Sequence, residues 1–195
     1  KDDHNTAGAR DIADRLIASF GSMLCYWYHY SHSGQRIPVE TDDDTVGGHF
    51  LHLLHRRPPP ASWVKAMHVS LNLYAEHEFN ASTFTARVVV STMSDIYSGV
   101  VGGIASLKGP LHGGANEAVM HMLLEVGEPS RAKEWMLAAL REKRVVMGFG
   151  HRVYKNYDPR AKIIKKACDE VLGSLDINDP LLEIAGLREM GAHYA

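Results

Sequence analysis

At 195 residues, the chain is long enough to bury a hydrophobic core and to form one or two domains. Its formal net charge of −2 provides no overall attraction to nucleic acid, so any anion-binding site must be local. The two cysteines, Cys25 and Cys168, form no disulfide or metal-ligand pattern, which fits a reducing compartment, and no apolar stretch is unbroken enough to span a membrane.

The spacing of apolar residues predicts an all-α protein. In chain order, helices are expected at Arg10 to Tyr30, in an apolar run through Leu54, at Trp63 to Tyr74, from a cap at Ser82 or Thr83 toward Met93, from Ser94-Asp95 through a part softened by Gly102 and Gly103, at Ala115 to Val126, at Arg131 to Lys143, and after N-caps at Asp158 and Asp179. The run Val145 to Met147 is a candidate strand, too short to change the fold class.

Twelve histidines are present, and those at 52, 55 and 121 fit surface or satisfied core roles. His77 instead ends the helix that carries Trp63, near its apolar face. A helix C-terminus favours a cationic imidazolium, which can hold a carboxylate. The position fits equally well a histidine that complements the helix dipole.

His112 directly precedes the helix that Gly113 and Gly114 open, in GPLHGGANEA. Because a helix N-terminus disfavours positive charge, we expect a neutral imidazole, which is suited to donating a hydrogen bond to an enolate oxygen. The glycines would let a ligand approach the backbone closely. A simple glycine-rich turn also fits this local pattern.

The stretch GFGHRVYKNYDPRAK places His151 in a glycine-flanked turn and Arg160 in the first turn of a helix. An arginine at that position can bind a carboxylate with two hydrogen bonds, and the helix amides add to the attraction. The neighbouring lysines are explained by a solvated helix face, but the glycine-flanked histidine is not. The stretch therefore predicts a site for an anionic substrate.

Taken together and in this order, AEHEFNAST, GPLHGGANE and GFGHRVYKNYDPRA resemble the citrate synthase family over most of the chain. Within the family, QRIPVETDDD, GGHFLHLLH and LYAEHEFNASTFTAR look most like 2-methylcitrate synthases, which condense propanoyl-CoA with oxaloacetate. Citrate synthases, which use acetyl-CoA, share the three histidine motifs and are the alternative. The resemblance implies a homodimer whose large domain (1–112 here) and small, mobile domain (113–195 here), both incomplete, close over substrate.

The resemblance also implies a role for each motif residue. His77 and Arg160 match residues that bind oxaloacetate, with Asn80 steadying the histidines. His112 matches the histidine that stabilises the enol of the acyl-CoA, and His151 the one that polarises and protonates the ketone. The segment along coenzyme A comprises Val145, Val146, Met147, Gly148, Phe149 and Gly150, with Lys155 near the phosphates. The chemistry needs no metal and no cofactor beyond the coenzyme A thioester, which is a substrate.

The family's catalytic base is an aspartate in a PN-x-D type motif that would follow the last residues, GAHYA. None of Asp169, Asp176, Asp179 or Glu183 stands in such a motif, and the family's N-terminal region would precede Lys1. We therefore interpret the chain as a central segment and expect these 195 residues alone to show little or no turnover. Without a visible signal peptide, the expected location is the cytoplasm, or the mitochondrial matrix in a eukaryote.

Two hypotheses from other classes are weaker. The first is a histidine-rich metal-binding module. His77-Glu78 lacks the second histidine of an HExxH helix, and the sequence has no cysteine pair that could add ligands. Zinc found bound to the protein would support this hypothesis. A purely structural helical interaction protein, which binds neither oxaloacetate nor acyl-CoA, leaves the glycine-flanked histidines unexplained. The sequence also argues against a serine hydrolase, because no G-x-S-x-G is present. It argues against a nucleotide-binding loop, because GGIASLKG departs from the P-loop pattern.

Overall fold

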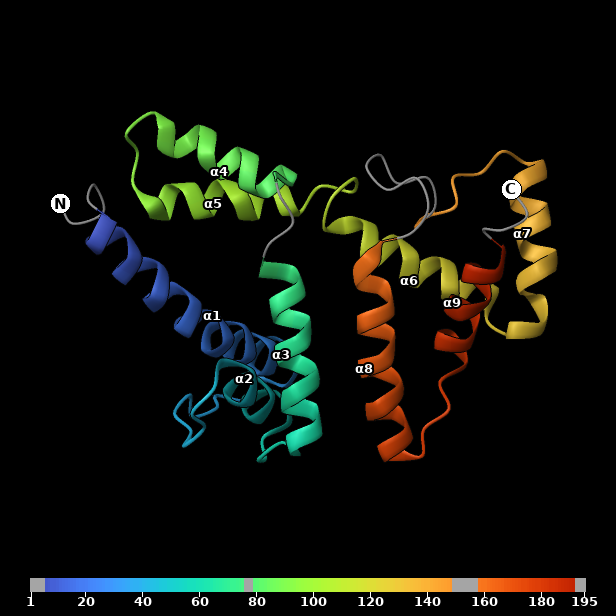
Figure 1. Cartoon of the computed structure of the whole chain (residues 1–195), viewed down its shortest axis with the longest axis horizontal. Helices are drawn as coiled ribbons and strands as arrows, with labels where there is room; N and C mark the ends of the chain where they lie inside the picture. Colours follow the sequence, from blue (N-terminus) through green and yellow to red (C-terminus); the bar gives the residue numbers. More distant parts are fainter. Residues whose placement is uncertain (1–5, 76–78, 149–157, 192–195) are drawn as a thin grey trace. The chain divides into compact units, whose positions relative to one another are not determined.

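The computed structural model describes residues 6–75, 79–148 and 158–191, and within these ranges every regular element is a helix (Figure 1). The helices are α1 (Thr6–Ser33), α2 (Val46–His55), α3 (Ala61–Ala75), α4 (Ala81–Ser91), α5 (Ile96–Leu107), α6 (Gly114–Val126), the 3₁₀ helix η2 (Pro129–Arg131), α7 (Ala132–Arg141), α8 (Pro159–Leu175) and α9 (Pro180–Gly191). The all-α prediction is confirmed, and the candidate strand at Val145 to Met147 is wrong. None of the helices described is long and apolar enough to cross a membrane.

Side chains that cap helix ends determine where several helices begin. Asn80 caps α4 because its Oδ1 accepts a hydrogen bond from the Thr83 amide at 2.9 Å, so the prediction that Ser82 or Thr83 caps this helix is wrong. Asparagine is among the best N-cap residues, and here it precedes the serine and threonine. Asp179 caps α9 as predicted, since its Oδ1 accepts from the Leu181 amide at 2.9 Å.

The chain forms two compact units, each of which we describe separately. The first unit comprises Lys1–Gly103 and Pro159–Ser174, and the second comprises Ile104–Asp158 and Leu175–Ala195. One boundary therefore falls inside α5, and another falls near the end of α8. The predicted large and small domains refer to a longer fold than this chain, and that division stays a prediction.

The core of the first unit lies where α1 packs on α2. Cys25, Ile37 and Leu53 are buried together, with Phe50 packed against them. The Cys25 thiol donates to the Phe50 carbonyl, with 3.6 Å between sulfur and oxygen, and burial raises the pKa of the thiol. This cysteine is therefore held as a neutral thiol inside the core.

Helices α4 and α5 form an antiparallel pair and lie side by side (Figure 1), and the part of α5 up to Gly103 belongs to the first unit with α4. A methyl group added to Gly99 would lie 2.8 Å from Cγ1 of Val90, and the Ser82 hydroxyl donates to the Gly103 carbonyl at 2.9 Å. The helix continues through Gly102 and Gly103, which were predicted to soften it. Its glycines instead face α4 and allow the two backbones to approach closely.

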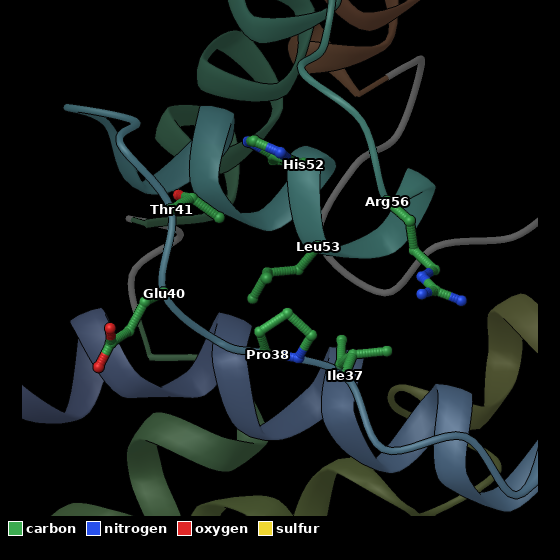
Figure 2. Close-up of a pocket in the computed structure, with 7 residues that line it drawn as sticks. All are labelled: Ile37, Pro38, Glu40, Thr41, His52, Leu53 and Arg56. Carbon is green, nitrogen blue, oxygen red and sulfur yellow. The ribbon is translucent and has the colours of Figure 1, made fainter.

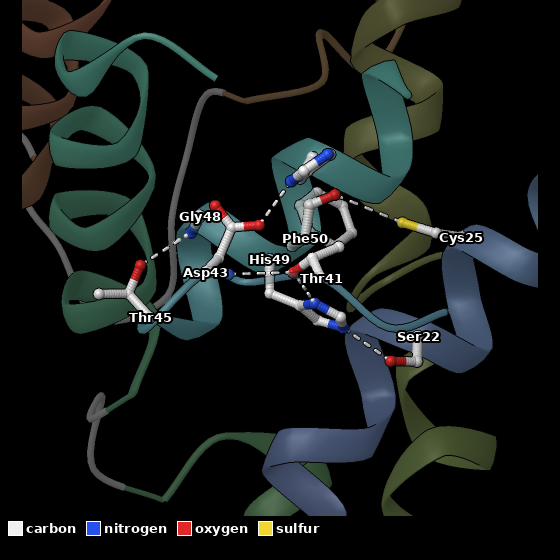
Figure 3. A network of polar contacts seen from close by, with 9 residues as sticks. Ser22, Cys25, Thr41, Asp43, Thr45, Gly48, His49 and Phe50 are labelled. Atoms are coloured by element: carbon white, nitrogen blue, oxygen red, sulfur yellow. Dashed lines mark hydrogen bonds and ion pairs between the residues drawn. The ribbon is translucent and has the colours of Figure 1, made fainter. Parts of the chain in front are cut away.

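Two histidines of α2 attach the segment between α1 and α2 to the helices (Figure 3). The His49 ring lies between two hydroxyls, with 2.8 Å from Nε2 to Ser22 Oγ and 2.8 Å from Nδ1 to Thr41 Oγ1. His52 Nδ1 lies 2.7 Å from Oδ2 of Asp43. The predicted satisfied role of His52 is confirmed, and the contacts hold the segment in a defined position.

The Asp43 carboxylate makes the stability of this network depend on pH. The hydrogen bond from Thr41, and after it the hydrogen bond and charge of His52, hold the pKa of Asp43 below its usual range. A carboxyl group whose pKa is lower in the folded than in the unfolded protein stabilises the fold at any pH above the unfolded-state pKa. That stabilisation is lost as the pH falls below about 4. We expect Asp43→Asn to lower the urea midpoint at pH 7, with a smaller difference from the unsubstituted protein at pH 3. The exposed neighbour Asp42→Asn is the control, and an equal loss in both variants would contradict the assignment.

Candidate active site

Arg160 lies in the first turn of α8, and its side chain reaches the end of α3. Nη1 donates to the Leu73 carbonyl at 3.4 Å, and the same two helices are joined by Lys65 and Glu170, whose Nζ and Oε2 are 3.8 Å apart. A helix C-terminus attracts cations, so the last carbonyls of α3 help to hold this half-buried guanidinium. The contact brings Arg160 to the helix that precedes His77, which itself lies outside the described residues.

Asn80 stands at the start of α4, where part of its side chain is already engaged. Its Oδ1 accepts from the Thr83 amide as the N-cap, and the residue is half-buried. The amide NH₂ is a separate donor group on the same side chain. The role of Asn80 in steadying the catalytic histidines stays a prediction.

His112 lies in a tight turn between α5 and α6, directly before the N-cap of α6 as predicted. Its amide donates to the Gly109 carbonyl at 3.0 Å, and its own carbonyl accepts from the Ala115 amide at 3.2 Å. A Cβ added to Gly113 would lie 2.5 Å from the backbone oxygen of Leu107. Packing of the turn against the end of α5 is therefore a reason for glycine at position 113 that the sequence pattern did not reveal.

We expect Gly113→Ala to destabilise the protein by about 1–3 kcal/mol, because the new methyl group meets a backbone atom that no side-chain rotation can move. The matched control is Gly173→Ala in α8, where nothing lies within 4 Å of the added Cβ. That substitution should instead stabilise by about 0.5–1 kcal/mol. Urea unfolding of both variants measures the difference. Equal effects would contradict the packing role of Gly113.

The first part of the segment predicted to lie along coenzyme A follows α7. Val146 packs against the core of the second unit, which consists of Met122, Leu123, Val126 and Ile184. Val145 is 83% exposed, Met147 is half-buried, and Gly148 has a φ of 87°. The rest of the predicted site, namely Phe149, Gly150, His151 and Lys155, lies outside the described residues.

The described site residues are divided between the two units. Asn80 and Arg160 belong to the first, whereas His112 and Val145 to Gly148 belong to the second. Among the residues that the structure describes, no three histidine, cysteine or acidic side chains are close enough to hold a metal ion.

A small pocket of about 160 Å³ lies in the first unit, between the segment after α1 and helix α2 (Figure 2). Its lining residues are Ile37, Pro38, Glu40, Thr41, His52, Leu53 and Arg56. The Arg56 guanidinium is held by Gln35, with 2.5 Å from Nη1 to Oε1. None of the predicted site residues lines this pocket, although most of its lining residues belong to the motifs QRIPVETDDD and GGHFLHLLH.

Comparison with known proteins gives the family. Residues 1–193 match the family model described as citrate synthase, C-terminal domain. Over 164 residues, the chain is 55% identical to the 2-methylcitrate synthase of Shewanella oneidensis, and this alignment covers 84% of this chain and 44% of that protein. Over 130 residues, it is 54% identical to citrate synthase 2 of Bacillus subtilis, which covers 66% of this chain and 35% of that protein.

A solved structure shows the same fold. The ternary complex of Thermoplasma acidophilum citrate synthase with carboxymethyl coenzyme A and oxaloacetate superposes with a TM-score of 0.83 and 36% identity. The superposition covers 93% of this chain and 48% of that chain, so the present chain spans less than half the length of these relatives. The match confirms what the three histidine motifs predicted: the chain belongs to the citrate synthase family.

Proposed function

We propose that the protein condenses propanoyl-CoA with oxaloacetate to give 2-methylcitrate and free coenzyme A. The observation that carries this proposal is the 55% identity to the Shewanella oneidensis protein named 2-methylcitrate synthase. The arrangement of Arg160 at the end of α3 and of His112 ahead of α6 supports it. Condensation of acetyl-CoA with oxaloacetate to give citrate is the second candidate, because the identity to the Bacillus subtilis citrate synthase 2 is similar, at 54%.

The proposed reaction begins with removal of a proton next to the thioester. Such protons are weakly acidic, so the family's aspartate base acts together with His112, which donates a hydrogen bond to the thioester oxygen. The enol carbon then bonds to the ketone carbon of oxaloacetate, and His151 protonates the ketone oxygen. Water hydrolyses the resulting thioester and releases the coenzyme A thiol. His77 and Arg160 hold oxaloacetate throughout.

Coenzyme A enters as part of the substrate, and the proposal includes no resident cofactor or metal. The segment from Val145 to Gly150 contacts the coenzyme, and Lys155 lies near its phosphates. The exposed side chain of Val145 supports this contact, because covering an apolar side chain with a ligand removes apolar surface from water and so favours binding. The cytoplasmic location stays a prediction.

We also propose that the protein is a homodimer. Large apolar side chains exposed along α4 and α5 are typical of an interaction surface: Phe84, Val88, Tyr97 and Val101 are each at least half exposed. Light scattering should give twice the mass of one chain. A monomeric mass at micromolar concentration would contradict the dimer.

The test of the function is thiol release from propanoyl-CoA and from acetyl-CoA in the presence of oxaloacetate, measured on the complete gene product that contains this chain. A higher kcat/KM with propanoyl-CoA supports the proposal. A preference for acetyl-CoA makes the protein a citrate synthase. No oxaloacetate-dependent release from either thioester contradicts both candidates.

A further inference from the structure

The chain leaves α7 through a defined turn that leads directly into Val145. Lys143 adopts a φ of 55°, and its amide donates to the Leu140 carbonyl at 3.2 Å. The Arg144 amide donates to the carbonyl of the fully buried Ala139 at 2.9 Å. This pair of hydrogen bonds around a left-handed residue is a Schellman motif. The backbone at Arg144 is therefore fixed by α7.

The side chain of Arg144 attaches the same point of the chain to α6. Nη1 and Nη2 donate to Oε1 and Oε2 of Glu125 at 3.0 and 2.9 Å, and the guanidinium carbon lies 5.1 Å from the centre of the Trp135 ring. These hydrogen bonds, which Arg144 donates and Glu125 accepts, lower the pKa of Glu125 and raise the pKa of Arg144. Two parallel hydrogen bonds and stacking on an aromatic ring are contacts that lysine does not reproduce.

The next two residues lie in different environments. Val146 packs on the core of the second unit, whereas Val145, between Arg144 and Val146, is 83% exposed. An exposed valine is thus held between two anchored residues, just before the left-handed turn at Gly148. If the Arg144 anchor is removed, the position of Val145 is defined from one side only.

We propose that Arg144 is a positioning residue, which Glu125 and Trp135 hold so that the segment from Val145 to Gly148 is placed to bind coenzyme A. This inference rests on the proposed function, which assigns the segment to coenzyme A. Glu125 balances the charge of Arg144, so the arginine acts through the segment and not as a ligand of the coenzyme phosphates. The two roles predict opposite effects of removing the Glu125 charge.

The test uses Arg144→Lys and Glu125→Gln in the complete protein, with Arg15→Ala as the control. Arg15 makes an exposed ion pair with Asp11 at 3.0 Å on α1, far along the chain from the segment. We expect both test variants to weaken coenzyme A binding in calorimetry, and to raise KM for the acyl-CoA, by about tenfold. Amide hydrogen exchange at Val145 to Gly148 should accelerate in both, while the KM for oxaloacetate and the control stay unchanged.

Several outcomes would overturn the inference. Tighter coenzyme A binding in Glu125→Gln would indicate a direct contact of Arg144 with the coenzyme phosphates, and unchanged binding in Arg144→Lys would show that the paired hydrogen bonds to Glu125 do not serve the site. Faster exchange without a change in affinity would show that the anchor does not serve the site. If the unsubstituted protein binds coenzyme A and both variants bind it equally well, this inference is contradicted but the proposed function is not. Failure of the unsubstituted protein to bind coenzyme A contradicts the proposed function as well.

Discussion

Replacing Arg160 with leucine should raise the KM for oxaloacetate about a hundredfold, equivalent to about 2.7 kcal/mol, with a smaller change in the KM for acyl-CoA. Hydrogen bonds to charged groups contribute about 1.5–3 kcal/mol, and an arginine can make two to one carboxylate. Arg160 is suited to this because it begins α8 and is held at the end of α3 by the Leu73 carbonyl. Steady-state kinetics with oxaloacetate as the varied substrate measures the change.

The control for this prediction is Lys165→Leu on the same helix. The Lys165 ammonium makes an exposed contact with Asp169 at 3.5 Å, a kind of pair that contributes little to stability. Its removal should leave the KM for oxaloacetate within about twofold. Because Arg160 also contacts α3, the thermal unfolding of both variants must be compared with that of the unsubstituted protein. A folded Arg160→Leu variant with an unchanged KM would contradict the carboxylate-binding role.

Local sequence signals predicted the helical architecture well. Apolar spacing and Gly127 predicted α6 to within one residue at each end, and Asp179-Pro180 predicted the start of α9. The start of α4 was placed too late because Ser82 and Thr83 are good capping residues, whereas Asn80, which precedes both, forms the cap. The strand prediction at Val145 to Met147 failed because short apolar runs also occur in irregular chain, and here Val146 packs on a core while Val145 is exposed.

Those residues of the candidate site could be predicted whose position depends on a nearby helix end. His112 before a helix and Arg160 in a first turn are visible as patterns, and the structure finds both at those positions. The contact of Arg160 with Leu73 joins residues 87 positions apart, and no local pattern encodes such a pairing. The salt bridge of Arg144 with Glu125 was missed for the same reason, because the two residues are 19 positions apart.

The second large effect is expected for His112→Ala, which should lower kcat about a thousandfold and leave the KM for oxaloacetate unchanged. Removing one donor to a developing oxyanion typically lowers kcat by about 10²–10³. His112 acts on the acyl-CoA in the proposed reaction, so the loss belongs to enolisation. Deuterium incorporation next to the thioester carbonyl in D₂O reports that step directly and should fall in parallel. His112→Gln keeps a neutral N–H donor and should lose less.

A matched control separates this role from a general effect of losing a histidine near α6. His121 lies on that helix with its Nε2 3.8 Å from Oε1 of Glu117, and both side chains are largely exposed. His121→Gln should therefore keep kcat within about twofold. If His112→Ala instead raised the KM for oxaloacetate at constant kcat, the histidine would bind the keto acid and not the enol. In that case another donor would have to stabilise the enol, and the division of labour between His112 and His151 would be reversed.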